Sequence, residues 1–295
     1  MSTPPRMKVG AAQFASVIGD VDANIDRHLH WIAEGRAAGL DLLVLPELSL
    51  TGHYGPERLL DVAISRDDPR LMQLAEAAGP MAVTLGFIEE GPAAQFYNAA
   101  AILKDGRMLH LHRKVNVPTY GKLEEGKHYA TGRFVETCEL AGHWMAGLLI
   151  CADVWNPALT HLAFLHGATM LICPVSSGTE AVGAGFDNPG GWALTSRFYA
   201  MMYGAPVIMV NRIGRERDLT FWGGSRIIDP FGRELAVAGE DEGMITADLD
   251  YQAVREARYL LPTVRDSNVA LILRETQRLV ETLGVPTFIR DPNQT

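Results

Sequence analysis

Short apolar runs alternate with amphipathic stretches from one end of the chain to the other. Strands are predicted at 8–14, 42–47, 81–88, 97–103, 107–114, 144–151, 170–175, 206–212, 224–229 and 243–249. Between them, apolar residues tend to recur every three or four positions, which is the spacing of a helix with one buried face. This alternation is typical of a layered α/β domain.

Two helices are marked most clearly. In the first, the apolar residues Ile25, Leu29 and Ile32 follow Asp20 and Asp22, which suit a helix N-terminus. In the last, the residues at helical spacing are Val269, Ile272, Leu273, Thr276, Leu279, Val280 and Leu283. Gly284 and Pro286 then predict where this helix ends.

The connections between these elements indicate one mixed architecture. Asp105-Gly106 separates two strand runs and is a tight-hairpin signal, so part of the sheet is antiparallel and the sheet is mixed. No low-complexity linker or change in composition divides the chain, which predicts a single domain over 1–295 with a C-terminal tail from about residue 284. The glycine-rich stretch 178–191 is either a surface loop or a mobile cover over a site.

Composition and charge exclude several classes of partner. The chain has 295 residues and a formal net charge of −9, and its densest basic stretch, Lys104 to Lys114, is a predicted strand. We therefore expect no nucleic-acid partner. The three cysteines, Cys138, Cys151 and Cys173, form none of the close pairs typical of zinc sites or disulfide frameworks.

The N-terminus and the hydrophobicity profile predict a soluble protein. Met1 to Arg6 is polar and leads directly into the first strand, without a charged and then apolar signal segment. No apolar run is long enough to cross a bilayer. We expect a cytoplasmic protein with reduced thiols and no membrane partner.

Three residues that could carry chemistry stand at the ends of predicted strands. Glu47 ends the apolar run 42–47, Cys151 ends 144–151, and Lys114 ends 107–114. Each has an ordinary interpretation when taken alone: a charged strand exit for Glu47, a solvated strand end for Lys114, and a buried structural thiol, like Cys173, for Cys151. A thiol at a strand-to-helix turn is also where a nucleophile is presented at a sheet edge.

Taken together, these residues belong to blocks that resemble the catalytic blocks of the nitrilase-like carbon–nitrogen hydrolases, amidase-type branch. The three blocks are Leu45-Pro46-Glu47, His112-Arg113-Lys114-Val115 and Leu149-Ile150-Cys151-Ala152-Asp153. Further matches are Pro118-Thr119-Tyr120-Gly121, Glu125 with Gly132, Trp222-Gly223-Gly224-Ser225 and Asp229-Pro230-Phe231-Gly232. The resemblance implies a four-layer α-β-β-α sandwich with mixed sheets and a homodimer or higher homo-oligomer.

The resemblance also implies the roles of the site residues. Cys151 is expected to be the nucleophile, Glu47 the proton carrier, and Lys114 with the N–H of Ala152 the oxyanion donors. A second glutamate is expected to support the lysine and help orient the substrate. Of the two neighbours Glu124 and Glu125, Glu125 is assigned this role because it stands seven residues before Gly132, as in the family pattern. The implied reaction cleaves a small non-peptide amide through a thioester, releasing acid and ammonia or amine, without a metal or cofactor.

Departures from the family pattern narrow the substrate class. True nitrilases typically carry Trp-Glu after the nucleophile, whereas this chain has Ala152-Asp153, which favours amides over nitriles. Val154 and Trp155 occupy the places of the arginines that hold N-carbamoyl-D-amino acids, so that class is not favoured. Cys-x-Asp-x-Trp is similar to the glutamine-hydrolysing domain of NAD synthetases, but the chain has no room for a synthetase domain. Nitrile hydrolysis, acyl transfer and a non-catalytic binding role are the alternatives.

Four aromatic residues are candidate substrate contacts: Tyr54, Tyr120, Trp155 and Trp192. Core packing is the ordinary alternative for each. His110-Leu111-His112 places two imidazoles on one strand face, but no third ligand is evident and no metal is predicted. Ser176-Ser177-Gly178 lacks the surroundings of a serine amidase and is interpreted as a loop.

Overall fold

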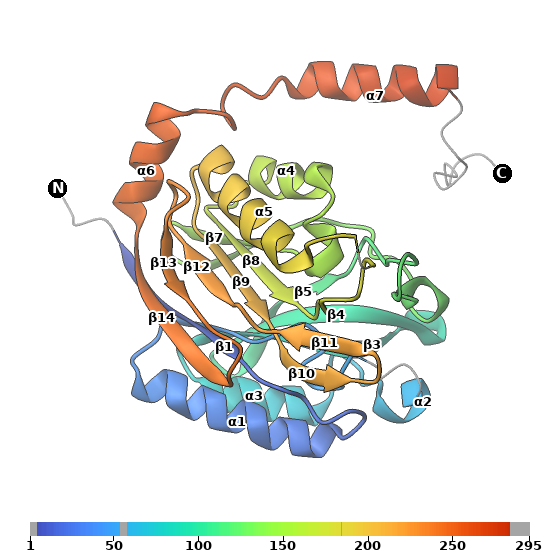
Figure 1. The fold of residues 1–295 in the computed structure, drawn as a ribbon. Helices are drawn as coiled ribbons and strands as arrows, with labels where there is room; N and C mark the ends of the chain where they lie inside the picture. Colours follow the sequence, from blue (N-terminus) through green and yellow to red (C-terminus); the bar gives the residue numbers. More distant parts are fainter. Residues whose placement is uncertain (1–4, 54–57, 184, 284–295) are drawn as a thin grey trace.

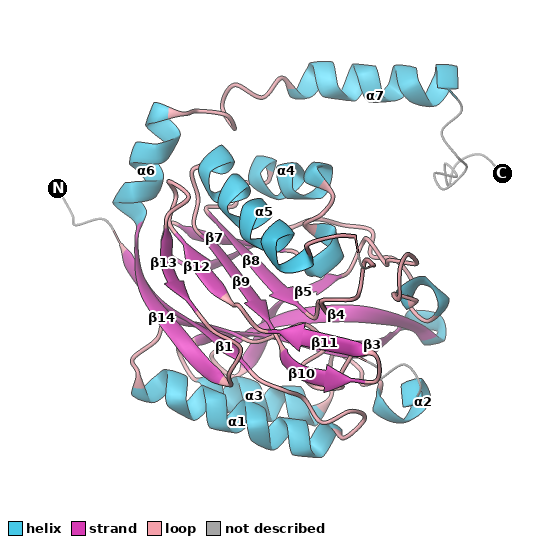
Figure 2. Cartoon of the chain, viewed as in Figure 1, coloured by secondary structure: helices cyan, strands magenta, loops and turns pink. Residues whose placement is uncertain are grey.

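The computed structural model describes residues 5–53, 58–183 and 185–283. Within these residues, the strands form two six-stranded sheets and one separate hairpin, and the helices lie outside the sheets (Figures 1 and 2). Tyr54, the tail from residue 284, Gly284 and Pro286 lie outside the described residues.

The first sheet has the order β14-β1-β2-β3-β4-β5. Its strands are β14 (Gly243–Asp250), β1 (Arg6–Gln13), β2 (Leu42–Val44), β3 (Ala82–Gly91), β4 (Gln95–Lys104) and β5 (Arg107–Arg113). The three strands β1, β2 and β3 run parallel, and β14, β4 and β5 pair antiparallel beside them. The β4–β5 hairpin turns at Asp105 and Gly106, which have φ of 52° and 71°, as the sequence predicted.

The second sheet repeats this plan in the order β13-β12-β9-β8-β7-β6. Its strands are β13 (Glu234–Val237), β12 (Arg226–Ile228), β9 (Val207–Asn211), β8 (Met170–Val175), β7 (Trp144–Leu148) and β6 (Thr137–Ala141). Again three strands, β7, β8 and β9, are parallel and the outer ones antiparallel. The separate hairpin consists of β10 (Ile213–Glu216) and β11 (Leu219–Trp222).

The helices cover the outer faces of the two sheets. α1 (Val21–Ala37) and α3 (Pro69–Ala78) lie on the first sheet, and α4 (Pro157–Leu165) and α5 (Asn188–Tyr203) lie on the second. The short α2 (Leu59–Val62) precedes α3, and α6 (Tyr251–Leu260) follows β14. α7 (Val269–Leu283) extends away from the body of the molecule (Figure 1).

Side-chain alternation along the central strands creates the layers. Leu43 on β2 packs with α1 and α3, whereas its neighbours Leu42 and Val44 pack against the second sheet. On β8, Ile172 faces the first sheet, and Cys173 faces the α4 and α5 side. Both faces of these strands are therefore buried, which confirms the predicted α-β-β-α sandwich with mixed sheets.

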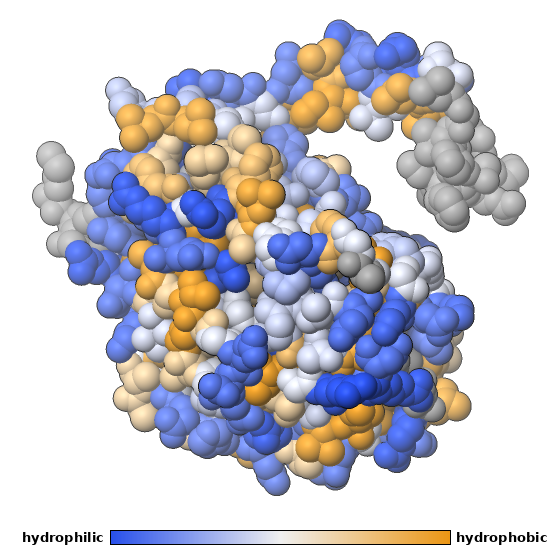
Figure 3. Space-filling model, viewed as in Figure 1, coloured by the Kyte–Doolittle hydropathy of each residue, from blue (hydrophilic) through white to orange (hydrophobic). Residues whose placement is uncertain are grey.

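The largest departure from the predicted packing concerns α7. The helix forms where the sequence predicted it, but its apolar side chains remain exposed, as Figure 3 shows for the described part of this helix. They are Val269, Leu271, Ile272, Leu273, Leu279 and Val280. Among the described helices, none combines the length and apolarity needed to span a bilayer.

Candidate active site

Glu47 lies just beyond the end of β2 and is almost completely buried. Its Oε1 accepts hydrogen bonds from Lys114 Nζ at 2.7 Å and from Asn98 Nδ2 at 2.8 Å. Its Oε2 accepts the backbone N–H of Ser176 at 2.7 Å. Three donors thus compensate the carboxylate for the water it has lost.

A close backbone contact holds this carboxylate in place. A Cβ atom on Gly86 of β3 would lie 2.3 Å from the backbone nitrogen of Leu48 and 2.9 Å from the carbonyl carbon of Glu47. Leu48 itself adopts a φ of 51°, which is unusual for a residue with a branched side chain. Only glycine at position 86 lets β3 lie directly against the turn that carries Glu47.

Lys114 follows β5 and has no exposed side-chain surface. Its Nζ donates to Glu47 Oε1 and to Glu125 Oε1, each at 2.7 Å. Its backbone is tied as well, because its N–H donates to the carbonyl of Asn98 and its carbonyl accepts from Gly132. Burial lowers the pKa of Lys114, but the charges of Glu125 and Glu47 outweigh that effect and raise it well above the ordinary value.

Glu125 completes the pair of carboxylates around the ammonium. Besides Lys114, it accepts a hydrogen bond from Asn98 Nδ2 at 3.3 Å. Burial and the charge of Glu47 raise the pKa of Glu125 to about 7, despite the opposing charge of Lys114. The neighbouring Glu124 is exposed and pairs with Lys127, so Glu125 is the glutamate that faces the lysine.

The two carboxylates therefore differ in acidity. Burial would raise the pKa of Glu47, but the Lys114 ammonium and the hydrogen bonds from Lys114 and Asn98 hold it below the ordinary value. At neutral pH Glu47 is ionised, and Glu125 is close to its titration point. A pair of groups with separated pKa values is a feature of sites that move protons.

Cys151 stands at the turn that follows β7 and begins the 3₁₀ turn Cys151–Asp153. Its φ of 44° is a left-handed conformation, a strained geometry that is common at functional sites. Burial raises the pKa of its thiol well above the ordinary value; the charge of Glu47 acts in the same direction, and Lys114 opposes both. The thiol is therefore protonated at neutral pH.

The surroundings of the thiols bear on how each could react. The negative charge of Glu47 makes the Cys151 thiolate less favourable. Cys138 and Cys151 are half-buried, whereas Cys173 is buried. Any role of Cys151 as a nucleophile thus needs proton removal during the reaction.

Asp153 joins the Cys151 turn to the end of β5. Its Oδ1 accepts the backbone N–H groups of Val115 at 2.9 Å and Asn116 at 2.7 Å. Its Oδ2 accepts the N–H of Ile150 at 3.1 Å and contacts His112 Nε2 at 2.8 Å. One fully buried carboxylate therefore sets the position of the thiol turn relative to the end of β5, which Lys114 follows.

The two imidazoles of the His110-Leu111-His112 segment have different surroundings, and within the described part of the chain only the His112 ring forms a hydrogen bond. His112 contacts Asp153, and no cluster of three or more potential metal ligands occurs among the described residues.

The segment 176–178, which the sequence predicts as a loop, contributes contacts to the site. In the structure, Ser176 binds Glu47 through its backbone, and the Ser177 hydroxyl accepts from Asn188 and Trp192.

The aromatic candidates separate by burial. Tyr120 is 47% exposed, and partial burial raises the pKa of its hydroxyl above the ordinary value. Trp155 contacts the ring edges of Phe186 and Trp192, with centroids 5.8 and 5.1 Å away. Trp192 has no exposed surface, which argues against direct substrate contact and makes it a support for Trp155.

The glycine-rich loop 178–191 contacts the turn that carries Tyr120. A Cβ atom on Gly121 would lie 2.1 Å from the carbonyl oxygen of Ala181, and Lys122 donates its N–H to the same oxygen at 3.0 Å. Phe186, from the same loop, packs on Trp155. The loop therefore forms part of the wall beside Tyr120 and Trp155.

Asn98 and His53 are site residues that sequence reasoning missed. Asn98 donates hydrogen bonds to both glutamates. It directly precedes the apolar run 99–103 of β4, and this position was the only indication of its role in the sequence. His53 is buried, and its Nδ1 lies 3.2 Å from the Ser176 hydroxyl oxygen. Burial lowers the pKa of His53 to about 4, so it is neutral at pH 7.

Comparison with known proteins relates this geometry to a family. The carbon–nitrogen hydrolase family model matches residues 8–259. An (R)-stereoselective amidase from a Pseudomonas species is 32% identical over 279 residues, covering 92% of this chain and 95% of that protein. The crystal structure of an amidase from Nesterenkonia sp. has the same fold, with a TM-score of 0.77, 22% identity, and coverage of 93% of this chain and 97% of that chain.

A second group of relatives is longer than this chain. The glutamine-dependent NAD(+) synthetase of Thermotoga maritima is 31% identical over 253 residues, which cover 83% of this chain and 42% of the synthetase. The corresponding protein of Acinetobacter baylyi is 28% identical over 226 residues, with 40% of its length covered. The chain thus spans about two-fifths of the length of these relatives.

The Asp153 contacts predict a large effect of Asp153→Asn on stability. Each carboxylate oxygen faces at least one backbone N–H, so an amide nitrogen in either position would oppose a donor. We expect the free energy of unfolding to fall by about 2–4 kcal/mol. The measurement is urea denaturation. The control is Asp250→Asn at the half-exposed N-cap of α6, because asparagine is as good an N-cap residue as aspartate. Equal midpoints for both variants would contradict this account.

Proposed function

The chain belongs to the carbon–nitrogen hydrolase family, and on this premise we propose that it cleaves a small non-peptide amide through a thioester on Cys151. The products are a carboxylic acid and ammonia or an amine. The observation that carries the proposal is the Lys114 ammonium held 2.7 Å from both Glu47 and Glu125, while Asp153 ties the Cys151 turn to the backbone N–H groups of Val115 and Asn116 directly after that lysine. No metal or cofactor is part of the proposed mechanism.

In the first step, Glu47 takes the thiol proton as the Cys151 sulfur attacks the amide carbon. Glu47 suits this role because it is ionised at neutral pH while the thiol is protonated. The new carbon–sulfur bond moves an electron pair onto the carbonyl oxygen. The Lys114 ammonium and the N–H of Ala152 stabilise that oxyanion, and one such donor is commonly worth about 3 kcal/mol.

In the second step, the protonated Glu47 gives its proton to the departing nitrogen, the carbon–nitrogen bond breaks, and a thioester is left on Cys151.

In the third step, Glu47, ionised again, takes a proton from water as the water oxygen attacks the thioester carbon. The carbon–sulfur bond breaks, the acid leaves, and the proton returns to the sulfur. Glu125 and Asn98 hold Lys114 and Glu47 in place through these steps.

The walls of the site favour a neutral or apolar acyl group. Tyr120 and Trp155 are proposed substrate contacts, with Trp192 packed behind Trp155. Val154 is buried and Trp155 is half-buried, and neither carries the positive charge that a substrate carboxylate would need. Short aliphatic or aromatic primary amides are the proposed substrates, and nitriles and acyl transfer to an amine are the alternatives.

Glutamine is a second candidate substrate. The glutamine-dependent NAD(+) synthetases are the relatives that favour it, together with the Cys-x-Asp-x-Trp pattern at 151–155. The same chemistry would release ammonia from the side-chain amide. Including glutamine in a substrate panel decides between the two amide classes.

The exposed face of α7 supports a homodimer. Apolar residues at helical spacing on this helix have no covering partner among the residues that the structure describes. An exposed apolar face of this kind is typical of a protein–protein interface. The apolar segment 285–289, a further candidate for the partner surface, lies outside the described residues.

Replacing Lys114 by Met tests the mechanism. Met keeps a long unbranched side chain but removes the charge, so turnover should fall by about two to three powers of ten. Ammonia release is measured for amides, glutamine and the matching nitriles, and we expect nitriles to react much more slowly than amides. Lys127→Met, an exposed change on the neighbouring turn, is the control. Full activity of Lys114→Met, or faster release from nitriles, would be inconsistent with the proposal.

The thiols should differ in reactivity toward iodoacetamide. We expect brief treatment at neutral pH to modify Cys151 first and to abolish activity, because Glu47 can take its proton. Cys173 should react last, since it is buried. Peptide mass mapping locates the label, and Glu47→Gln should slow labelling of Cys151 but not of Cys138. A label on Cys138 alone with loss of activity would refute the assignment of the nucleophile.

Charge on α7 should disrupt the proposed dimer. Ile272→Glu combined with Leu279→Glu places two charges on its apolar face, whereas Leu60→Glu changes an exposed leucine on α2. Light scattering at micromolar concentration should give a dimer mass or a multiple of it for wild type and Leu60→Glu, and a smaller species for the double variant. A monomeric wild type would exclude the dimer.

A further inference from the structure

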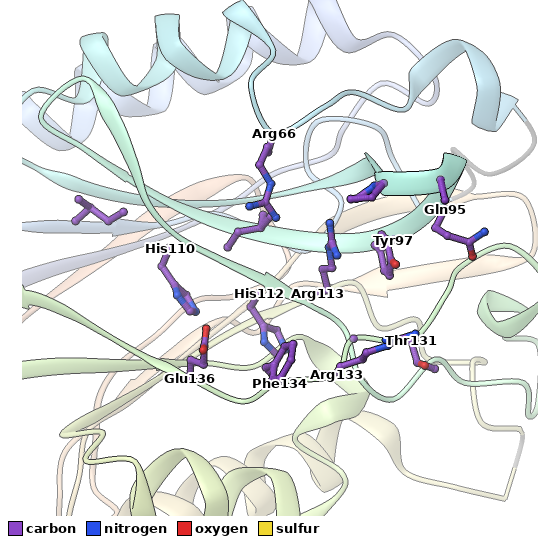
Figure 4. A pocket seen from close by; sticks show the side chains of 15 residues that line it. Arg66, Gln95, Tyr97, His110, His112, Arg113, Thr131, Arg133, Phe134 and Glu136 are labelled. Carbon is purple, nitrogen blue, oxygen red and sulfur yellow. The ribbon is translucent and has the colours of Figure 1, made fainter. Parts of the chain in front are cut away.

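A cavity of about 680 Å³ lies along the outer edge of β5, separate from the candidate active site. We call it the β5 cavity, and its charged and ring-bearing lining includes Arg66, Tyr97, His110, Arg113, Arg133 and Glu136 (Figure 4). Cys151, Glu47, Lys114 and Glu125 do not line it, although its wall includes Gly132, whose N–H donates to the Lys114 carbonyl. Its size is that of a typical small-molecule site.

The guanidinium groups come from three separate segments of the chain. Arg113 ends β5, Arg66 precedes α3, and Arg133 follows the glutamate turn at 125 (Figure 4). Two carboxylates oppose their three positive charges, the buried Glu89 and the exposed Glu136. One positive charge is therefore in excess at neutral pH, which favours an anion.

Arg113 is held in a fixed orientation. Its Nε and Nη2 donate to Glu89 at 2.6 and 2.8 Å, and its guanidinium carbon lies 4.0 Å from the centroid of the Tyr97 ring. Arg66 donates more weakly to the same carboxylate, at 3.4 Å. Glu89 and Tyr97 thus preorganise Arg113, and its contacts with Glu89 use Nε and Nη2. A preorganised donor loses little entropy on binding a ligand.

Two other polar groups of the cavity, the Arg133 guanidinium and the His110 ring, are available to a ligand. Arg133 is exposed and forms no ion pair with any described residue. The buried Nε2 atom of His110 has no hydrogen-bond partner in the described part of the chain. A buried polar atom without a partner is uncommon in a folded protein, and a bound ligand would provide one.

We propose that the β5 cavity binds the phosphate group of a small phosphate monoester. Guanidinium groups form paired hydrogen bonds with phosphate oxygens, and a tetrahedral phosphate can accept donors from several directions. Donors from Arg66, Arg113 and Arg133 approach the cavity from three segments, which suits a tetrahedral anion better than a planar carboxylate. The exposed Phe134 on the rim offers an apolar surface to the remainder of the ligand.

The test is calorimetric titration of the full chain in a chloride buffer at pH 7. The probes are inorganic phosphate and phenyl phosphate, with acetate and chloride at equal ionic strength as comparators. We expect saturable binding of both phosphates, with about ten- to a hundredfold weaker binding in Arg66→Gln/Arg133→Gln. Arg274→Gln/Arg278→Gln, an equal loss of two charges on α7, and Cys151→Ser should each bind as the wild type does.

Binding is measured directly, so the result is independent of the proposed amide hydrolysis. Stronger binding of phenyl phosphate than of inorganic phosphate would support a monoester, and equal binding would still support the phosphate site. Acetate binding as tight as phosphate, an equal response to chloride, or unchanged affinity in the double arginine variant would each overturn the proposal. Both substituted arginines are exposed, so the variants are expected to fold.

Discussion

The organisation of the site depends on one buried ammonium group between two carboxylates. Lys114, Glu47 and Glu125 are each almost completely removed from water, and each would be costly to bury alone. Their contacts join β5, the turn after β2, and the 3₁₀ turn at 125, while Asn98 adds β4 and Ser176 adds the end of β8. These contacts fix the position of one sheet relative to the other, so a charge cluster joins the two sheets in addition to the apolar core between them.

The sequence predicted the central strands well, for a physical reason. Strands such as β2 and β8 are buried on both faces, so they appear as continuous apolar runs. The edge strands β6 and β13 and the hairpin β10–β11 were not predicted, because they are short and partly exposed and have a weaker apolar pattern. α7 was predicted correctly as a helix, but its amphipathic pattern could not reveal that no part of the described chain covers it.

The same contrast applies to the site. Glu47 and Lys114 were recognisable because, together with Cys151, they stand in blocks that resemble those of a known family, and the structure places both in one cluster with Glu125. The N–H of Ser176 has no signature in a sequence, since every residue except proline carries one. Three of the four contacts of Asp153 are with residues about 40 positions away in the sequence, which only the fold brings together. Likewise, an aromatic pattern cannot distinguish Trp155, at the wall, from Trp192 behind it.

The contact between Gly86 and the turn after Glu47 has a consequence for how such an enzyme can diverge. The backbone at Glu47, the proposed proton carrier, lies so close to Gly86 that a side chain at position 86 would clash with it. Substitutions of Gly86 would therefore be strongly selected against. Tyr120, Trp155 and Phe186 instead stand on turns and on the loop 178–191, where replacements leave the strands undisturbed. New acyl specificities can therefore arise by substitutions in those loops, while the proposed bond-cleaving groups are inherited unchanged.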